Sequence, residues 1–414
     1  MKTGCTLARF AALLAVLAAG LAANADTAPG CEGPNHYILS KCEHELRLEW
    51  MAVPDSLLAH GRGHAATLLE DGRVLVVGGG TWHIDPETWT RIRQRVGAEI
   101  YDPVSRTWSL TAPMSVPRMY GAHAVRLLDG RVMVLDGEEL DNDLQGSVEI
   151  FDPASGAWTR TANLLIPRVS FTATLLESGE VLVAGGVDRT DATVAVAEIY
   201  NPESGTWRTT GSLHSARFGH TATILPDGRV LVAGGVLDDW IHEPAATGEL
   251  FDPETGTWSP AGRITQGWAH TATSLGHGLV LVAGGTRTEC PGGLRCSSPI
   301  TAQSTRLYDA ESGAWMDAGN MISRRYEHLA MAIPGHGVLL VGGVVDVAPA
   351  PQYRVASVER SELFEFATGT WKEVVPLNRL PTEARQYYSA TRLADGTFLL
   401  IGDAEGKRAV QLSY

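Results

Sequence analysis

Residues 219–235, GHTATILPDGRVLVAGG, decide the fold because the chain repeats them with few changes. Related stretches begin at Gly63, Ala122, Ala269 and Glu327, and each has alternating small residues, a turn such as Asp-Gly, a run such as Val-Leu-Val and usually a Gly pair. Alternation followed by a glycine-containing turn is typical of two antiparallel strands in a hairpin. The Gly pair ends the second strand, where the backbone needs an angle that a side chain would hinder. A repeat of this kind outweighs chain length in assigning the fold.

A second phrase follows each copy after a stretch of variable length. Examples are EIYDPVSRTW at residues 99–108, EIFDPASGAW at residues 149–158 and ELFDPETGTW at residues 249–258. A strand reaches an aromatic residue, Asp-Pro begins a turn and Trp opens the next strand. The unit therefore contains four strands and recurs about every 50 residues, which predicts an all-β propeller built from four-stranded blades.

Both marks of the repeat occur seven times. The hairpin tryptophans are Trp50, Trp108, Trp158, Trp207, Trp258, Trp315 and Trp371. Trp50 precedes the first Gly pair, whereas the last degenerate pair, at Gly402, is followed only by one more strand-like phrase, RAVQLSY. We therefore predict a seven-bladed ring over residues 46–414 whose last blade shares N-terminal and C-terminal strands. Such closure leaves no open sheet edge.

These phrases resemble kelch repeats, which are marked by a double Gly after the second strand and by Tyr and Trp across the later hairpin. The resemblance covers residues 46–414 and implies a kelch-type β-propeller with seven blades. It leaves the function open, because kelch propellers include binding modules as well as enzymes.

The first 45 residues are expected to lie outside the ring. Residues 1–25 begin with a basic, then apolar run and end in Ala-Asn-Ala, which predicts a signal peptide and a secreted or periplasmic protein. Residues 26–45 then form a short N-terminal segment. The alternative is a lipoprotein that is acylated at Cys31.

Four cysteines follow the predicted signal peptide, in two local pairs. An even number of cysteines in an exported chain favours disulfides, so we predict the bonds Cys31–Cys42 and Cys290–Cys296. Metal binding is the alternative. Neither pair has the two-residue spacing of common zinc sites, and no histidine cluster accompanies them.

The formal net charge of the mature chain argues against some classes of binding partner. Loss of the signal peptide removes two of 33 basic residues and none of 47 acidic ones, which gives a formal charge of −16. This charge argues against nucleic acid and anionic membranes as partners. No later stretch reaches the 18 continuous apolar residues of a membrane span. We expect a monomer without a transmembrane segment and without a cofactor.

Binding residues are expected on one face of the ring. The connection between the second and third strands of a blade varies in length, and it shares a face with the connection to the next blade. This loop face surrounds the mouth of the expected central channel. Aromatic residues that break the repeat there could stack on a sugar or a peptide, or could only fix the loops. They are Trp82, Trp240, Trp268, Tyr326 and Tyr387.

Basic residues also recur before the first strand of a blade. They could form a cationic mouth for a carboxylate, or each could tie one blade to the next. The arginines concerned are Arg118, Arg168, Arg217, Arg325 and Arg385. Histidines such as His220 and His270 begin the same strand in five blades. Their repetition favours a packing or hydrogen-bonding role over a ring of metal ligands.

Among enzymes with a kelch ring, galactose oxidase is the informative comparison. Arg-Gln-Tyr-Tyr at residues 385–388 and the Gly-Gly-x-Trp phrase before His83 resemble parts of its copper site. Tyr388 stands where that family needs a histidine, and no cysteine begins an inner strand, so we expect no copper site. The alternative enzyme is a sugar epimerase or mutarotase on the loop face. The sequence favours a recognition module for a protein segment or glycan, with no catalytic residue.

Overall fold

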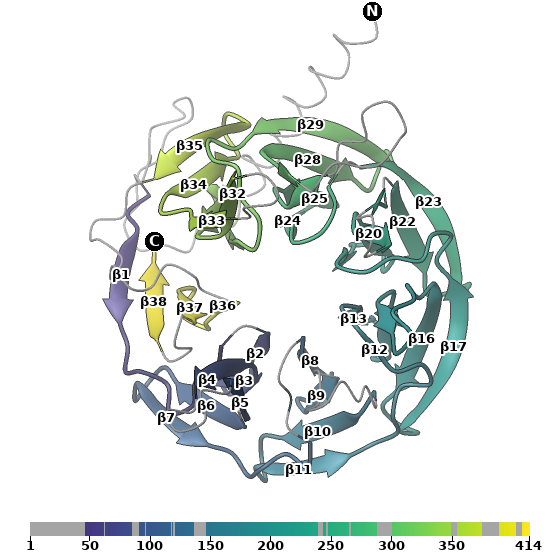
Figure 1. Ribbon diagram of the computed structural model, residues 1–414, viewed down its shortest axis with the longest axis vertical. Coiled ribbons are helices and arrows are strands. Elements are labelled where there is room, and N and C mark those ends of the chain that lie inside the picture. Colours follow the sequence, from purple (N-terminus) through teal and green to yellow (C-terminus); the bar gives the residue numbers. More distant parts are fainter. Residues whose placement is uncertain are drawn as a thin grey trace, which may run out of the picture.

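The computed structural model describes residues 46–61, 63–84, 91–95, 97–116, 118, 121–135, 146–238, 243–245, 247–264, 266–287, 300–348, 354–374, 389–402 and 408–414, with the backbone alone at 81–84, 91–95, 238, 243, 244, 287, 348 and 354. These residues form seven four-stranded sheets in a ring, a seven-bladed β-propeller (Figure 1). No helix occurs in the described ranges, and hence none long and apolar enough to cross a membrane.

The seven blades follow the chain, and each is listed from its inner to its outer strand. Blade 1 is β2 (His64–Leu68), β3 (Val74–Gly78), β6 (Ala98–Asp102) and β7 (Thr107–Leu110); blade 2 is β8 (His123–Arg126), β9 (Val132–Leu135), β10 (Val148–Asp152) and β11 (Ala157–Arg160); blade 3 is β13 (Thr172–Leu175), β14 (Val181–Ala184), β16 (Val196–Asn201) and β17 (Thr206–Ser212). Blade 4 is β18 (Thr221–Ile224), β19 (Val230–Ala233), β22 (Thr247–Asp252) and β23 (Thr257–Arg263); blade 5 is β24 (Thr271–Gly276), β25 (Leu279–Ala283), β28 (Ser304–Asp309) and β29 (Ala314–Asn320); blade 6 is β30 (Leu329–Ile333), β31 (Gly337–Val341), β34 (Ser361–Glu365) and β35 (Thr370–Val374). Blade 7 is β36 (Ser389–Arg392), β37 (Phe398–Ile401), β38 (Ala409–Ser413) and β1 (Glu49–Ala52), so its outer strand comes from the N-terminal end of the described chain.

Five two-stranded sheets extend from the blades, and all except β12 with β15 are hairpins of consecutive strands. Their strands are β4 (Gly80–Ile84) with β5 (Arg91–Arg95), β12 (Arg168–Val169) with β15 (Val187–Asp188), β20 (Val236–Asp238) with β21 (Glu243–Pro244), β26 (Thr286–Arg287) with β27 (Ile300–Thr301), and β32 (Val344–Ala348) with β33 (Arg354–Ser357).

The repeated turns form because their side chains bond locally. In blade 4, Asp227 accepts the N–H of Arg229 at 3.1 Å, and Gly228 lies between them with a φ of +80°. Such positive angles favour glycine. The strand that follows, Val230–Ala233, is buried along its whole length. The Asp-Gly-Arg phrase therefore directs an apolar strand into the blade.

The Gly pair allows neighbouring blades to approach closely. Gly185, at the end of β14, has a φ of +68°, and a Cβ atom there would lie 2.4 Å from the ring of His220 and 2.5 Å from the carbonyl oxygen of Arg217. Both contacts are with the following blade. A side chain at this position would therefore force the two blades apart.

The hydrophobic core is divided between neighbouring blades. One buried cluster joins Leu231 of blade 4 to Val280 and Tyr308 of blade 5. The outer tryptophans add a polar link, since the indole N–H of Trp258 donates to the carbonyl oxygen of Gly211 in blade 3 at 2.8 Å. Each blade is thus stabilised mainly by its two neighbours.

The ends of the chain close the ring, as the sequence predicts. Strand β1 pairs antiparallel with β38, and the register places Trp50 opposite Leu412. Trp50 is 5% exposed and Leu412 is fully buried. The N-terminal strand is therefore the outer strand of blade 7 (Figure 1).

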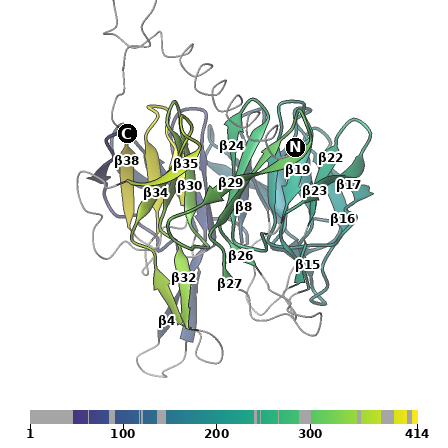
Figure 2. The ribbon, with the colours of Figure 1, turned by 90° about the horizontal axis from the view of Figure 1, so that it is seen from above.

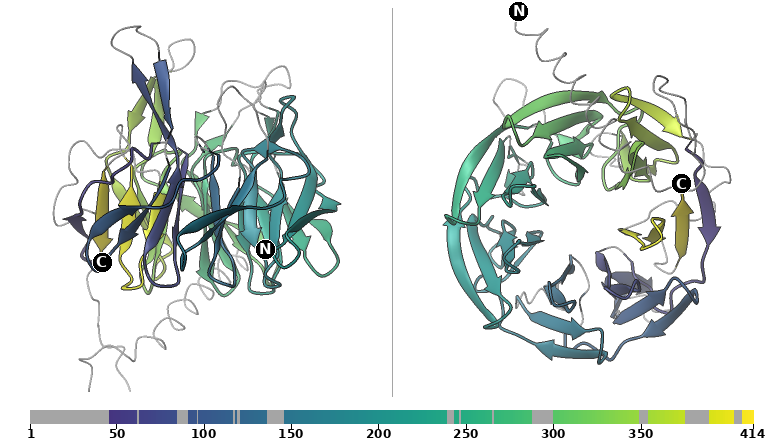
Figure 3. Two further views of the ribbon diagram at one scale, coloured as in Figure 1. Left: turned by 90° about the horizontal axis from the view of Figure 1, so that it is seen from below. Right: turned by 180° about the vertical axis from the view of Figure 1, so that it is seen from behind.

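The two faces of the ring differ. The hairpins β4–β5 and β32–β33 project from one face, which is the loop face, and β15, β26 and β27 lie on the same side (Figure 2). The opposite face carries the short repeated turns, and we call it the turn face. A view turned the other way shows the same two projecting hairpins above the compact ring (Figure 3).

Candidate functional site

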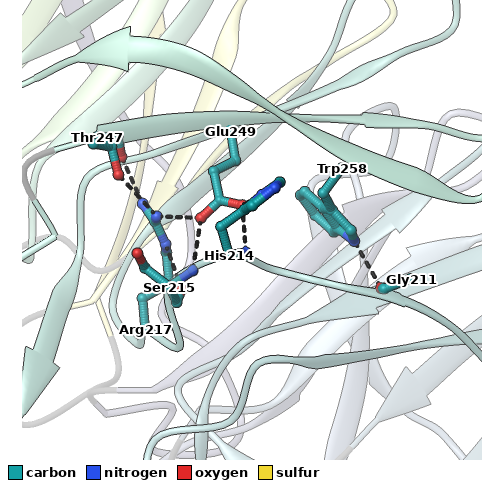
Figure 4. A network of polar contacts seen from close by, with 7 residues as sticks. All are labelled: Gly211, His214, Ser215, Arg217, Thr247, Glu249 and Trp258. Carbon is teal, nitrogen blue, oxygen red and sulfur yellow. Dashed lines mark hydrogen bonds and ion pairs between the residues drawn. The ribbon is translucent and has the colours of Figure 1, made fainter.

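The loop face of blade 4 contains a buried ion pair between Arg217, which precedes the inner strand, and Glu249 on β22 (Figure 4). Their charged atoms are 2.5 Å apart, and their side chains are at most 3% exposed. Arg217 also donates to the carbonyl oxygens of Gly234 and Thr247, at 3.1 and 2.6 Å. Burial lowers the pKa of Arg217, and the charge of Glu249 opposes that change. The pair fixes the start of the inner strand to its own blade.

The backbone of the same arginine contacts the preceding blade. The carbonyl oxygen of Arg217 accepts the N–H of Gly186 at 2.8 Å, and that of Arg325 accepts the N–H of Gly285 at 2.9 Å. Gly186 and Gly285 are the second members of the Gly pairs in blades 3 and 5. Each of these arginines therefore links two blades.

Three other blades repeat the ion pair of blade 4. All three arginine side chains are 0% exposed, so a ligand cannot reach them unless a glutamate is displaced. Each guanidinium is bonded within its own blade, so the contact with the preceding blade comes from the backbone, as at Arg217, and not from the charged group. The pairs are Arg118 with Glu149, Arg168 with Glu198, and Arg325 with Glu362.

In blade 1, a histidine replaces the arginine. His60 Nδ1 lies 2.7 Å from the carbonyl oxygen of Gly78, and Nε2 lies 2.9 Å from the Glu99 carboxylate. Both side chains are 0% exposed. The sequence pattern did not reveal this role because His60 lies four residues before the inner-strand histidine, whereas Arg217 lies three before it.

Blade 5 has neither member of the usual ion pair. Gln266 donates to the carbonyl oxygen of Ser304 at 3.3 Å, a contact equivalent to one that Arg217 makes in blade 4. The register places Arg306 where blade 4 has Glu249. The Oε1 atom of Gln266 is buried and has no hydrogen-bond partner among the described residues. Blade 5 therefore departs from the repeat in both charge and hydrogen bonding.

The recurrent histidines join neighbouring inner strands. His220 Nε2 lies 3.0 Å from the Thr172 hydroxyl of blade 3, and His270 Nε2 lies 3.0 Å from the Thr221 hydroxyl of blade 4. Burial lowers the pKa of His220 to about 3 and that of His270 to about 4. Both imidazoles are therefore neutral at pH 7. The same contact joins His64 to Ser389 and His328 to Thr271.

Three successive blades carry an aromatic residue two positions before the inner-strand histidine. Phe218, Trp268 and Tyr326 occupy this position in blades 4, 5 and 6, and each side chain is half-buried. Backbone hydrogen bonds hold Phe218 to Val236 and Tyr326 to Val344, where the loop-face hairpins begin. We call Phe218, Trp268 and Tyr326 the aromatic shelf, and the ring of equivalent positions the inner rim.

The shelf is continuous between blades 5 and 6. The ring centroids of Trp268 and Tyr326 are 5.8 Å apart, with the planes tilted by 53°. The Tyr326 hydroxyl donates to Asp346 at 3.4 Å, and the Thr301 hydroxyl donates to the other oxygen of Asp346 at 2.8 Å. Blade 3 has Val169 at the equivalent position. The shelf therefore makes one side of the inner rim aromatic.

Glu327 follows the shelf in a conformation that side chains disfavour. Its φ is +52°, in the left-handed region, whereas blade 4 has Gly219 at this position with a φ of +61°. Ser170 and Ala269 are equivalent and have φ values of +56° and +57°. The N–H of Glu327 donates to the carbonyl oxygen of Ala269 at 3.0 Å. This contact between blades helps to hold the strained backbone.

Of the other predicted binding residues, the structure describes the backbone of Trp82, and the rest lie outside the described residues. For Trp82 it describes the backbone, on β4, where the register pairs it with Arg93. The predicted disulfides and the remaining loop residues stay predictions. The positions outside the described residues are Cys31, Cys42, Trp240, Cys290, Cys296, Arg385 and Tyr387.

A cavity of about 420 Å³ lies on the turn face between blades 2 and 3. Leu128, which is 70% exposed, lies in its lining. Three of the charged lining residues are already paired, since Arg131 is bound to Asp129 at 2.6 Å and Glu180 is bound to Arg208 at 3.0 Å. The repeated turns therefore build this cavity, whereas residues that break the repeat build the aromatic shelf.

Comparisons with known proteins extend only to the fold. No protein-family model matches the chain, and no curated protein matches its sequence. A copper-bound fungal alcohol oxidase of the AA5 family matches 88% of this chain and 76% of its own, with 16% identity and a TM-score of 0.64. The structure of YjhT matches over 71% of this chain and 97% of its own, with 15% identity and a TM-score of 0.53. The likeness is one of fold.

The described residues do not fit a copper site. Within the described ranges, no group of three or more His, Cys, Asp or Glu residues is placed to hold a metal ion. Four of the inner-strand imidazoles are buried and have Nε2 beside a hydroxyl of the neighbouring blade, as His270 does at Thr221.

Proposed function

We propose that this chain is an exported recognition module of the kelch type that binds a glycan or a protein segment on its loop face. The observation that carries the proposal is the pair of Trp268 and Tyr326, whose rings lie 5.8 Å apart on the inner rim. Both side chains are half-buried, so each keeps some exposed surface. Rigid aromatic groups provide a large contact area at a low cost in conformational entropy.

The surroundings of this pair support binding rather than packing alone. Asp346 holds the Tyr326 hydroxyl and is itself held by Thr301, so the ring is oriented before any ligand arrives. Preorganisation of this kind favours affinity because less freedom is lost on binding. Export through a signal peptide at residues 1–25 and disulfides in the two cysteine pairs belong to the same proposal, and they suit a module that meets its ligand outside the cytoplasm.

The proposal is tested with the mature chain on a glycan array and against a displayed peptide library. Trp268→Ala and Tyr326→Ala should each weaken the best ligand by at least about tenfold, as removal of an aromatic anchor usually does. Val169→Ala, at the equivalent position of blade 3, is the matched control and should bind normally. A ligand that binds all three variants as well as the parent would refute binding on the shelf.

A sugar epimerase or mutarotase is the second candidate, because the Glu327 carboxyl group follows the shelf directly in the chain and could serve as an acid or base. If the protein is a mutarotase, proton NMR will show that it accelerates the interconversion of the α and β anomers of a reducing sugar that it binds on the glycan array. If the protein accelerates this exchange and the Glu327→Gln variant does not, the proposal of a recognition module is wrong and the protein is an enzyme.

A further inference from the structure

The strands β4 and β5 of blade 1 form a two-stranded sheet whose two faces differ in charge. The register pairs Trp82 with Arg93 and Ile84 with Arg91, and partners directly opposite one another share a face. Alternate residues of a strand also share a face, so the three arginines of β5 belong to one face of this sheet. We call it the arginine face, and its members are Gly80, Trp82, Ile84, Arg91, Arg93 and Arg95. The other face holds Thr81, His83, Ile92 and Gln94.

This concentration of positive charge is particular to blade 1 among the described two-stranded sheets. The strands β4 and β5 contain three arginines and no acidic residue. Each of the other four two-stranded sheets has at most one lysine or arginine. The whole chain has a formal net charge of −14. The arginine face therefore departs both from the repeat and from the charge of the chain.

The sheet that carries the arginine face is open to a partner. It projects from the ring beyond the blades (Figure 2, Figure 3). Within the described residues it contains only β4 and β5, so β5 is paired on one side alone. An edge strand offers backbone N–H and C=O groups to which another extended segment can pair. Arginines along such an edge repel a second copy of the same strand and attract a strand of opposite charge.

We propose that β5 pairs with an extended acidic segment of a partner protein that carries Asp or Glu at alternate positions. Alternate residues are about 6.8 Å apart in both strands, so three acidic residues on one face of the added strand stand opposite Arg91, Arg93 and Arg95. Backbone hydrogen bonds supply affinity, and the cross-strand charge pairs select the sequence. The proposal adds a surface on blade 1 to the proposed function and does not depend on the aromatic shelf.

Other polyanions match this face less well than an acidic strand does. A nucleic acid or a sulfated glycan has no peptide backbone to complete the edge of β5. The acidic net charge of the chain also repels a long polyanion. A short peptide strand brings both the amide groups and the spacing. Spacing is therefore the property that distinguishes the proposed partner from other sources of negative charge.

The test measures the binding of labelled peptides to the mature chain by fluorescence anisotropy. The alternating peptide has three glutamates at alternate positions among threonines, and the control peptide has the same composition with a glutamate at every third position. In the control only one glutamate at a time can stand opposite an arginine of β5. We expect the alternating peptide to bind about fivefold or more tightly, because the control loses two of three cross-strand charge pairs. Heparin serves as the polyanion that cannot pair as a strand.

Two variants with the same change in net charge separate pairing on the arginine face from general attraction. Arg93→Gln removes a positive charge from this face, and Gln94→Glu adds a negative charge to the other face. Arg93→Gln should weaken the alternating peptide by about threefold or more, whereas Gln94→Glu should change its affinity by less than about twofold. Arg354→Gln, on the other projecting hairpin, is a second control and should leave binding unchanged.

A charge swap tests the pairing through a gain of binding. The triple variant Arg91→Glu, Arg93→Glu and Arg95→Glu should lose the alternating glutamate peptide and should bind an alternating lysine peptide that the parent protein does not bind. Its unfolding temperature should stay within about 2 °C of the parent's, because the sheet projects from the ring and the substitutions lie outside the blade cores.

Four results would overturn the proposal. They are equal affinity of the alternating and control peptides, equal effects of Arg93→Gln and Gln94→Glu, tighter binding of heparin than of the alternating peptide, and no binding of that peptide. The proposed function is tested separately, because it depends on Trp268 and Tyr326. A ligand from the array or library that is lost in Trp268→Ala supports the proposed function even when the alternating peptide does not bind.

Discussion

The imidazole of His60 lies 2.9 Å from the carboxylate of Glu99, in the place where four other blades hold an arginine. The contact lies at the start of blade 1, directly after the segment that joins β1 to the ring. Glu99 also accepts the backbone N–H of Leu57 at 2.9 Å. One buried carboxylate thus orders the connection between the closing strand and the first inner strand.

Removal of His60 should destabilise the ring. His60→Ala leaves the buried carboxylate of Glu99 with the N–H of Leu57 but without the imidazole, which should cost about 1–3 kcal/mol of unfolding free energy. His60→Arg restores the residue type of the other blades and should be tolerated much better than alanine. Urea unfolding measures both. Arg208→Ala, which breaks the exposed pair with Glu180, should cost less than about 1 kcal/mol and serves as the control. Equal losses for His60→Ala and Arg208→Ala would contradict a stabilising role for the buried contact between His60 and Glu99.

The altered pair of blade 5 predicts strong coupling between two substitutions. Gln266→Arg alone brings a second cation near Arg306, and Arg306→Glu alone places a carboxylate beside an uncharged glutamine. The double variant recreates the Arg–Glu pair of blade 4, so the two changes should be coupled favourably by about 1–3 kcal/mol. A double-mutant cycle by urea unfolding checks this value. Additive effects would show that Gln266 and Arg306 do not occupy one shared site.

The buried histidines predict loss of stability in mild acid. Burial lowers the pKa of His270 to about 4 and that of His220 to about 3, whereas an unfolded histidine titrates near 6.5. The unfolded chain therefore binds more protons below pH 6.5, and the free energy of unfolding should fall between pH 6.5 and about pH 4. Above pH 6.5 this contribution is constant.

Unfolding by urea at a series of pH values measures the effect. His270→Gln removes one titrating group and should lower the pH slope by up to about 1.4 kcal/mol per pH unit. A parent protein with the same stability at pH 7 and pH 4.5 would show that the imidazoles are not buried in neutral form.

Ring closure predicts that two N-terminal deletions behave differently. Deletion of residues 26–45, which precede β1, should leave the unfolding temperature nearly unchanged. Deletion of residues 26–52 removes β1 and leaves the edge of β38 without its partner, so the unfolding temperature should fall sharply. Trp50→Ala should cost about 3–5 kcal/mol, since the indole is 5% exposed. Differential scanning calorimetry on the mature chain distinguishes these results, and a 26–52 deletion as stable as the 26–45 deletion would disprove closure.

The ring could be predicted from the sequence because each blade repeats the same local signals. The Asp-Gly turns, the Gly pairs and the outer tryptophans recur at corresponding strand ends in most blades. The offset of Trp50 from the first Gly pair predicts the pairing of β1 with β38. These signals are local, so one sequence contains enough copies to count. The two structures that resemble the ring agree with a propeller, and the kelch type remains part of our proposal.

The candidate site could be predicted only in part, because it depends on contacts between blades. Trp268 and Tyr326 were recognisable as departures from the repeat, but their 5.8 Å separation requires the ring to be assembled. The arginines recur just as regularly, and only the structure shows that residues such as Arg217 are buried against glutamates. The strain at Glu327 has a weak sequence signal, since blades 1 and 4 have glycine there whereas blades 3 and 5 have Ser170 and Ala269. This sequence difference indicates strain only once the structure shows that the backbone φ at Glu327 is positive.

The central claim is that ligands bind to the residues that break the repeat on the loop face. The most direct measurement compares Trp268→Ala with Leu128→Ala, a substitution in the cavity of the turn face, on the same glycan array and peptide library. We predict that Trp268→Ala weakens the best ligand of the parent protein by at least about tenfold while Leu128→Ala binds normally, with both variants retaining the parent's β-sheet circular dichroism. A ligand that ignores Trp268→Ala and is lost in Leu128→Ala would contradict the account and move the binding site to the turn face.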